Sequence, residues 1–364
     1  MLAVFLVTFP FFALIAAGYA AGRLRWLPLE AIPGLNTFVL YFALPCMLYR
    51  FGASTPIAQL LDASVVLVWG CCAMLVVAGV VRWSRAPTLG TGVSSLPPEG
   101  ASAGLGRPGA GRRNARMGWN DAAFGALVAA FSNTGFMGVP LITALLGAQV
   151  VGPIIITIIF DIFVTASLCI ALSRLDGADK HGASRALRQA LKGVFVNPLP
   201  WAILLGALAS AAQFKLAGPL DRTVAMLADA ASPAALFTIG AVLARSALLA
   251  GRHDASAAVA AAMGSAPRAS APAPLADVLL EVAVKLFVHP LLVYGAARGA
   301  TTLGLPLSRE AVVAMVLVAA LPSASNVAML AERFGADNGR IARIILWSTA
   351  AAFLSFPLVV GWMK

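Results

Sequence analysis

Two short stretches combine asparagine with glycine, serine or proline inside otherwise apolar sequence: FSNTGFMGVP at 131–140 and LPSASN at 321–326. Glycine and proline weaken or remove helical hydrogen bonds, and at membrane depth the freed backbone groups must meet protein, water or ligand. The N-terminus of a half-helix carries partial positive charge, so two such ends that cross in a bilayer predict a site for a small anion. The residues that we expect to line this site are Asn133, Thr134, Gly135, Pro140, Pro322, Ser323, Ser325 and Asn326.

The two asparagines have a second interpretation. Asn133 or Asn326 alone is explained as well by a hydrogen bond to a neighbouring helix or by capping of a broken end. Together, with proline nearby, they favour a cavity lining, because polar groups inside a membrane are costly and usually face a cavity. Four further residues are assigned to hinges or support, since a proline kink that shapes packing explains them adequately. These are Asn36, Pro45, Ser232 and Pro233.

Three charged residues lie within apolar segments. Asp161 needs either a polar partner or a proton, so it is a candidate for proton coupling, with structural pairing as the equal alternative. Glu281 and Lys285 stand four residues apart, which favours a structural ion pair on one helix face. The alternative is that Lys285 attracts the substrate anion.

His289 is the one histidine in an apolar segment, so no metal site is predicted. The two interrupted segments also lack the paired carboxylates that a cation antiporter would use. Sodium held by carbonyls and hydroxyls stays possible, as does coupling to protons, and no cofactor is expected.

The composition demands a membrane protein to position these residues. The chain has 364 residues, of which 60% are hydrophobic and 11% charged, whereas soluble domains carry about a quarter charged residues. The net charge of +11 comes mostly from loops without a basic-aromatic groove, which argues against nucleic acid as a partner. The bilayer is the expected partner, and we predict an all-α fold with ten transmembrane helices. Their ranges are 2–22, 32–50, 60–83, 121–146, 151–173, 197–214, 224–249, 275–298, 310–334 and 340–362.

The positive charges predict the orientation. Alternate loops hold 19 of the 26 Lys and Arg residues, and such loops face the cytoplasm. Both termini should therefore lie outside the cytoplasm, with the chain in the cytoplasmic (inner) membrane. The first segment has no cationic residues before it, so we expect it to be retained rather than cleaved.

A shift of 188 residues aligns the chain with itself and predicts an internal repeat. Gly18 then meets Gly206, and the stretch from Pro45 to Gly52 meets the stretch from Pro233 to Gly240. The expected organisation is a first five-helix repeat at 1–173, a connector at 174–196 and a second repeat at 197–364, with linkers at 84–119 and 250–274. Because five is odd, the second repeat should be inverted, as in many secondary transporters.

The stretches SNTGFMGVP, LPSASNVAMLAERFG, LNTFVLYFALP and KLFVHPLL resemble the auxin efflux carrier family, including its bacterial malonate-carrier-like members. The resemblance covers nearly the whole chain outside the two linkers. It implies two inverted five-helix repeats, a crossover of the broken helices four and nine, and transport of small organic anions such as dicarboxylates or indole-type acids. It also implies that Asn133, Pro140, Pro322 and Asn326 contact the substrate.

The function predicted from the sequence is a secondary carrier that moves a small mono- or dicarboxylate, such as malonate or malate, by alternating access. The alternative is a non-transporting sensor or scaffold built on a transporter fold. An enzyme is not expected, because no G-x-S-x-G motif, no histidine set against a serine and no second deep aspartate occurs. Small-residue faces such as Gly18 with Gly22 pack helices within one chain or between two, so a homodimer stays possible.

Overall fold

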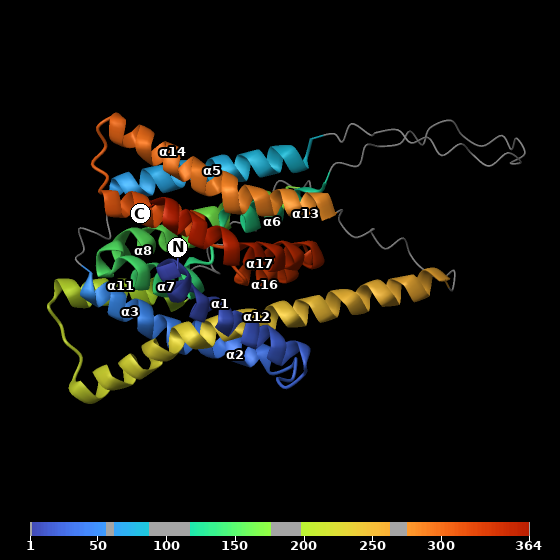
Figure 1. The fold of residues 1–364 in the computed structure, drawn as a ribbon, viewed down its shortest axis with the longest axis horizontal. Coiled ribbons are helices and arrows are strands. Elements are labelled where there is room, and N and C mark those ends of the chain that lie inside the picture. Colours follow the sequence, from blue (N-terminus) through green and yellow to red (C-terminus); the bar gives the residue numbers. More distant parts are fainter. Residues whose placement is uncertain (1, 56–61, 87–116, 176–197, 263–274, 364) are drawn as a thin grey trace, which may run out of the picture.

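The structure, a computed structural model, describes residues 2–55, 62–86, 117–175, 198–262 and 275–363. Residues 87–116 of the first expected linker, 176–197 around the connector and 263–274 of the second linker lie outside these ranges. Within the described ranges every regular element is a helix and no strand is formed (Figure 1). The α-helices are α1 (Leu2–Arg23), α2 (Ile32–Phe38), α3 (Leu44–Ser54), α5 (Ala63–Ser84), α6 (Trp119–Ala130), α7 (Val139–Leu146), α8 (Val151–Phe160), α9 (Ala166–Leu172), α11 (Pro198–Ala211), α12 (Gly218–Ala262), α13 (Leu275–Ala283), α14 (His289–Thr302), α15 (Arg309–Ala319), α16 (Asn326–Phe334) and α17 (Asn338–Met363).

Short wider or tighter turns join several of these helices into longer rods. The wider π-helical turns are η1 (Val39–Ala43), η2 (Thr134–Gly138), η4 (Asp161–Thr165) and η5 (Val284–Val288), and the tighter 3-10 turn is η3 (Ala148–Val150). Such π-turns are frequent at functional sites. Three of them hold residues that the sequence marks for function, since Thr134 and Gly135 lie in η2, Asp161 begins η4 and Lys285 lies in η5.

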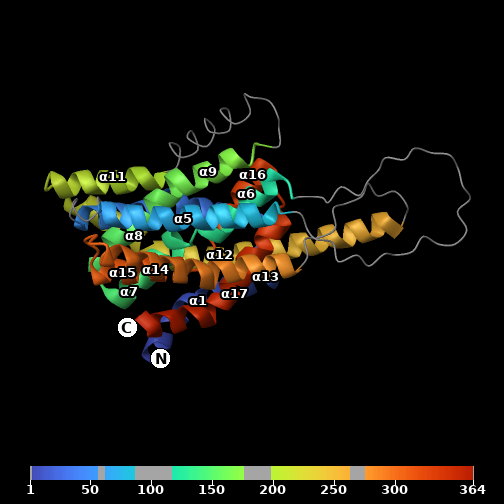
Figure 2. The same ribbon diagram turned by 90° about the horizontal axis from the view of Figure 1, so that it is seen from above.

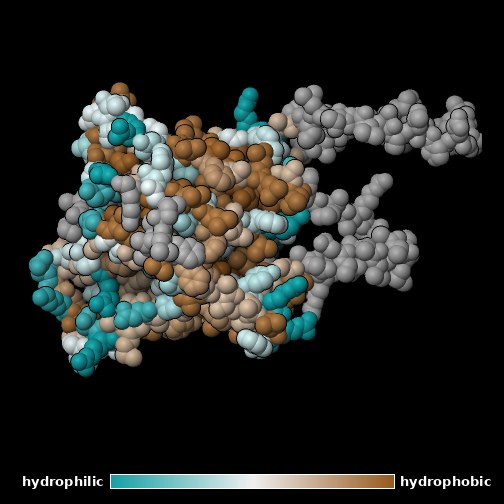
Figure 3. Space-filling model, in the orientation of Figure 1, coloured by the Kyte–Doolittle hydropathy of each residue, from teal (hydrophilic) through white to brown (hydrophobic). Residues whose placement is uncertain are grey.

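Among the described residues, five helical segments are long and apolar enough to cross a membrane. They are Ile32–Ser54, Ala63–Ser84, Ala148–Leu172, Gly218–Arg245 and Asn338–Met363. Figure 3 shows hydrophobic side chains gathered over the middle of one face and many of the hydrophilic ones toward its ends. Large apolar side chains such as Leu354 and Leu291 are more than half exposed, as expected where the outer solvent is lipid. The chain is a multi-pass membrane protein.

Helices α1, α3, α11 and α12 form one bundle, in which α12 packs on α1 and α3, and α3 packs on α11. Glycines allow this close approach. A Cβ on Gly18 would lie 1.9 Å from the carbonyl oxygen of Phe237, and one on Gly240 would lie 1.9 Å from that of Ile15. Only hydrogen fits at these positions, so the two backbones touch.

The remaining helices form a second bundle around the two interrupted segments. Its contacts include α5 with α6 and α14, α14 with α15, α6 with α9, and α13 with α17. The first bundle meets it where α12 contacts η2 and α17, and where α1 contacts α7 and α17 (Figure 2). The η2 turn lies directly after the first interruption, so this interface borders the predicted site.

Helix α12 is longer than a membrane requires, at 45 residues. Its last turns, residues 250–262, belong to the segment that the sequence assigns to a linker. Alanine has the highest helix propensity, and the alanine-rich sequence here continues the helix, which ends at Ala262 within the described residues.

Candidate functional site

The two interruptions face each other in the interior. The backbone N–H of Asn133 donates to the carbonyl oxygen of Pro322 at 2.9 Å, and the N–H of Ala324 donates to that of Phe131 at 3.1 Å. These bonds form a short antiparallel bridge between Ser132 and Ser323. Each break thus satisfies backbone groups of the other, as a membrane interior requires.

The half-helices that follow the two breaks both begin at this bridge. Asn133 precedes η2 and α7, and Asn326 opens α16, so two helix N-termini lie beside the bridge. Pro140 follows the π-turn η2 inside the half-helix Thr134–Leu146, where it removes one backbone N–H donor. This geometry supplies partial positive charge at the bridge.

Polar side-chain atoms are left without partners at the same place. Asn133 Oδ1, Asn326 Oδ1 and Ser323 Oγ are buried and have no hydrogen-bond partner in the described part of the chain. Buried polar atoms are normally paired, so an unpaired group requires an explanation such as a ligand or water. Thr134 and Ser325 are also buried here. A Cβ placed on Gly135 would meet nothing within 4 Å, so open space adjoins the first break.

Lys285 ties the two breaks together. Its fully buried ammonium group donates to Ser132 Oγ at 2.6 Å and to the carbonyl oxygen of Ala319 at 3.0 Å, and contacts His289 Nδ1 at 3.3 Å. Three partners match the three donors of an ammonium group. Ala319 is the last residue of α15, and the helix dipole stabilises a cation at this end of a helix. Lys285 therefore fixes the relative position of the crossing segments.

Asp161 is paired rather than isolated. Its Oδ1 accepts from Trp69 Nε1 and Thr165 Oγ1, each at 3.0 Å, while Oδ2 has no partner in the described residues. The Trp69 ring packs on His289 at 5.3 Å between centroids, and Asp161 is close enough to Lys285 for electrostatic interaction. Asp161 thus reaches the crossing through a hydrogen bond to Trp69, the ring contact of Trp69 with His289, and the contact of His289 with Lys285.

The expected ion pair between Glu281 and Lys285 is wrong. Glu281 instead forms a buried salt bridge with Arg340 of α17. The guanidinium of Arg340 also donates to the carbonyl oxygen of Asp121 at 3.2 Å. The physical reason is twofold: Arg340 satisfies the carboxylate, and the π-turn from Val284 changes the angular spacing that an i, i+4 pair needs.

The residues assigned to hinges or support are not at the bridge. Asn36 lies half-buried in α2 and Pro45 lies in the first turn of α3. Pro233 is an exposed residue inside α12, and Ser232 lines a hollow between α3 and α12.

Several polar residues at the site have no role predicted from the sequence. Ser132 directly precedes the predicted Asn133, and Ser348 Oγ accepts the backbone N–H of Ser323 at 3.2 Å. Trp69 lies in an apolar segment, so the sequence predicts a core residue and does not reveal its hydrogen bond to Asp161. Arg340, counted among the loop cations, is 2% exposed. Its place as the first residue of the predicted segment 340–362 was the signal that it lies within the helical part.

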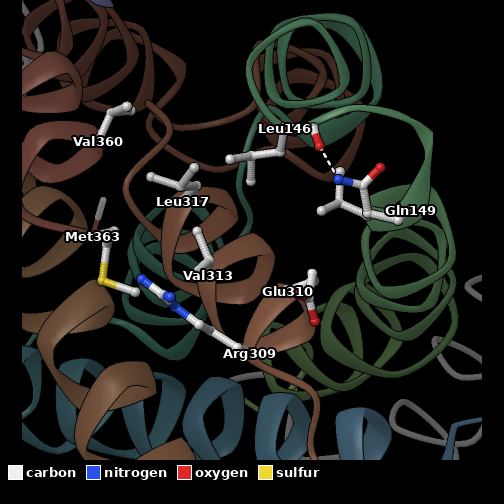
Figure 4. A pocket seen from close by; sticks show the side chains of 9 residues that line it. Leu146, Gln149, Arg309, Glu310, Val313, Leu317, Val360 and Met363 are labelled. Atoms are coloured by element: carbon white, nitrogen blue, oxygen red, sulfur yellow. Dashed lines mark hydrogen bonds between the residues drawn. The ribbon is translucent and has the colours of Figure 1, made fainter.

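A second hollow opens at the end of the second bundle at which α15 begins (Figure 4). Leu146, Leu317 and Val360 form apolar walls, and Arg309, Glu310 and Gln149 supply the polar groups. In the figure the Arg309 guanidinium lies beside Met363. The cavity has a volume of about 240 Å³. It is separate from the paired breaks.

Helices that pack in a bilayer, with two of them broken and paired in the interior, are the arrangement found in many secondary transporters. Residues 115–360 match the family described as "Membrane transport protein". The chain belongs to this family, and the resemblance to the auxin efflux carriers is thereby confirmed.

Two relatives carry transporter names. A Rhizobium meliloti (strain 1021) protein named "Putative malonate transporter" is 27% identical over 352 residues, which cover 97% of this chain and 92% of the relative. An "Uncharacterized transporter" of Methanothermobacter thermautotrophicus is 28% identical over 239 residues, which cover 64% of this chain and 65% of the relative.

Proposed function

We propose that this protein is a secondary transporter that carries a small mono- or dicarboxylate, such as malonate or malate, across the cytoplasmic membrane by alternating access. The observation that carries the proposal is the pair of broken helices, whose N-termini and unpaired polar atoms lie at one buried bridge. Partial positive charge at the helix N-termini and the amide NH2 groups of the asparagines suit an anion. The name of the Rhizobium relative agrees with this substrate class.

The inverted repeat of ten helices belongs to the same proposal, and the glycine contacts support it. Gly18 and Gly240 make one close contact between α1 and α12, and Gly206 and Gly52 make another between α11 and α3. A two-fold relation that exchanges residues 188 apart turns the first contact into the second. The carbonyl groups that these glycines approach correspond as well: Phe237 corresponds to Tyr49, and Ile15 corresponds to Ile203. Duplicated units related by such an axis are common in secondary transporters.

The bridge is also symmetric, but it exchanges residues 191 apart, Ser132 with Ser323, rather than 188. Asn133 bonds Pro322 and Ala324 bonds Phe131, so exchanging the two breaks reproduces the pairing. We infer that residues 1–173 and 197–364 are the two repeats, with both termini outside the cytoplasm. Labelling Leu303→Cys, an exposed site in the loop before α15, with an impermeant maleimide on intact cells tests the orientation.

The roles of the site residues follow from their surroundings. Asn133, Thr134, Gly135, Ser323, Ser325 and Asn326 line the substrate site, and Pro140 and Pro322 keep the breaks open. Lys285 holds the breaks together, and Asp161 is the candidate for proton coupling. Sodium is the alternative coupling ion, and the protein needs no cofactor.

Uptake of radiolabelled malonate and malate into proteoliposomes tests the proposal, with Asn133→Ala and Asn326→Ala as variants. We expect saturable uptake by the wild type and a loss in both variants while the protein stays folded. Asn338→Ala, at the start of α17, serves as the control because it lies away from the bridge.

Three results would count against the proposal in different ways. Uptake that survives both substitutions would return the asparagines to structural roles. Absence of flux for every carboxylate would remove the substrate class. Absence of any transport by a folded protein would favour the second candidate, a sensor or scaffold.

A further inference from the structure

A hollow of about 450 Å³ lies between α3 and α12, apart from the paired breaks. Its walls carry one cation and one anion on facing helices, Arg50 on α3 and Asp229 on α12. The remaining lining residues are Met47, Phe51, Ser54, Ala228 and Ser232.

The hollow belongs to the inner side of α3. Along this helix Val39, Ala43 and Met47 are buried, and Arg50, Phe51 and Ser54 continue the same helical face. Phe38, Tyr41 and Phe42 are exposed on the other side of the segment, where lipid is expected. Arg50 therefore does not point toward the bilayer.

The residues of α12 that line the hollow also lie on the inner side of their helix. Ala228, Asp229 and Ser232 share a face with the buried residues Ala235, Leu236 and Ile239, which follow at helical spacing. Helix α12 also contacts η2, the turn that begins the half-helix after the first break. The hollow thus lies within the first bundle, on a helix that also borders the buried seam between the two bundles.

Arg50 and Asp229 are available to a ligand. Both side chains are exposed, and no salt bridge within 4 Å joins them to each other or to another charged group among the described residues. A guanidinium fork matches a carboxylate with two parallel hydrogen bonds. Ser54 and Ser232 add hydroxyl groups beside it.

We propose that Arg50 is the residue that captures the substrate carboxylate from the outer solution, in a hollow where Asp229 competes for the same guanidinium. The proposal rests on the carboxylate transport proposed above and adds a specificity-determining residue to it. Capture by Arg50 precedes passage along the seam to the bridge. Asp229 keeps the resting site from holding the anion too tightly, because its charge opposes the charge of the carboxylate.

Concentration dependence of malonate uptake by the full-length protein in proteoliposomes tests this role. Arg50→Gln should raise KM roughly tenfold or more and change the maximal rate little, since a hydrogen-bonded ionic contact is lost. Arg50→Lys should give an intermediate KM, because lysine keeps the charge and loses the fork. Asp229→Asn should lower KM.

Arg222→Gln is the matched control. Arg222 is an exposed arginine in the first turns of α12, the helix that carries Asp229, and lies outside the hollow, so its replacement removes one positive charge without changing the lining. A KM shift in Arg50→Gln no larger than in this control would overturn the proposal. A higher KM in Asp229→Asn would contradict the proposal that Asp229 competes with the substrate carboxylate for Arg50.

A second measurement covers the case in which Arg50→Gln does not fold. In a background with Cys46, Cys71, Cys72 and Cys169 replaced, Ser54→Cys should react with a charged thiol reagent more slowly when malonate is present. Unchanged reactivity in a preparation that transports malonate would overturn the proposal while leaving the proposed function intact. Loss of uptake in Asn133→Ala tests the proposed function separately.

The occupant of the hollow can also be a second copy of the chain. Light scattering on Arg50→Gln distinguishes this outcome. A dissociated oligomer with an unchanged KM would assign Arg50 to a subunit contact and overturn the proposal.

Discussion

At the scale of single residues, Lys285 is the side chain on which the geometry of the crossing depends most. Lys285→Met removes donors from Ser132 Oγ and the Ala319 carbonyl oxygen and leaves both buried. We expect a loss of about 3 kcal/mol in unfolding free energy, the usual cost of leaving buried polar partners unmatched. Thermal unfolding in detergent measures it.

Lys215→Met provides the control, because Lys215 is exposed and its replacement removes the same positive charge. Equal stability of the two variants would show that the ammonium group does not hold the breaks. We also expect Lys285→Met to abolish malonate uptake, since the bridge would lose its fixed geometry.

Asp161→Asn separates charge from structure. The amide oxygen can still accept from Trp69 and Thr165, so the fold should be kept. If this carboxylate carries the coupling proton, the variant should exchange malonate across the membrane and no longer respond to an imposed pH gradient. Uptake that the gradient still accelerates would exclude Asp161 as the coupling group, and Asp221→Asn, an exposed position, is the control.

Part of this site could be predicted from the residues alone. Proline, glycine and asparagine in apolar sequence mark broken helices because their effect is local, and both breaks lie where Asn133 and Pro322 predict them. The partners of Lys285 and Glu281 could not be predicted, since Ser132 and Arg340 reach them only through tertiary packing. A sequence shows what a residue can bind, whereas the fold determines which neighbour it meets.

At the scale of elements, the glycine contacts of the first bundle give a sharp prediction. Gly18→Ala places a Cβ 1.9 Å from a backbone oxygen, which no side-chain movement relieves. We expect a loss of about 1–3 kcal/mol or a separation of α1 from α12. Gly240→Ala should behave alike, and Gly206→Ala, 2.3 Å from the carbonyl oxygen of Tyr49, should do so if the two contacts are equivalent.

Gly79→Ala is the matched control for these variants. Gly79 lies inside α5 with nothing within 4 Å of its added Cβ, so alanine should stabilise the helix by up to about 1 kcal/mol. The comparison uses thermal unfolding in detergent. A destabilised Gly79→Ala, or a tolerated Gly18→Ala, would contradict the packing.

Helix positions were easier to predict than helix ends. Apolar length alone locates segments such as Ala63–Ser84, because burial in lipid requires about 20 apolar residues. It does not reveal that α12 continues to Ala262, since alanine supports a helix in water as well as in lipid. The π-turns also leave no mark in hydropathy.

At the scale of the whole molecule, alternating access requires the two bundles to move against each other. The interface offers a place to block this movement. Phe12 of α1 and Phe353 of α17 come from different bundles, and their rings lie 5.2 Å apart between centroids. Replacing both with cysteine in a cysteine-free background and joining them with a short bis-maleimide should reduce malonate uptake to the level of empty liposomes.

A control cross-link within the second bundle distinguishes blocked movement from damage caused by the reagent. Tyr294 of α14 and Trp362 of α17 lie 4.6 Å apart between ring centroids, and the same reagent should join cysteines there. These helices should move as one body, so uptake should persist after cross-linking. The link between Phe12 and Phe353 restrains the interface between the bundles, which alternating access would have to open. Uptake that survives this link would therefore mean that the substrate crosses without relative movement of the bundles.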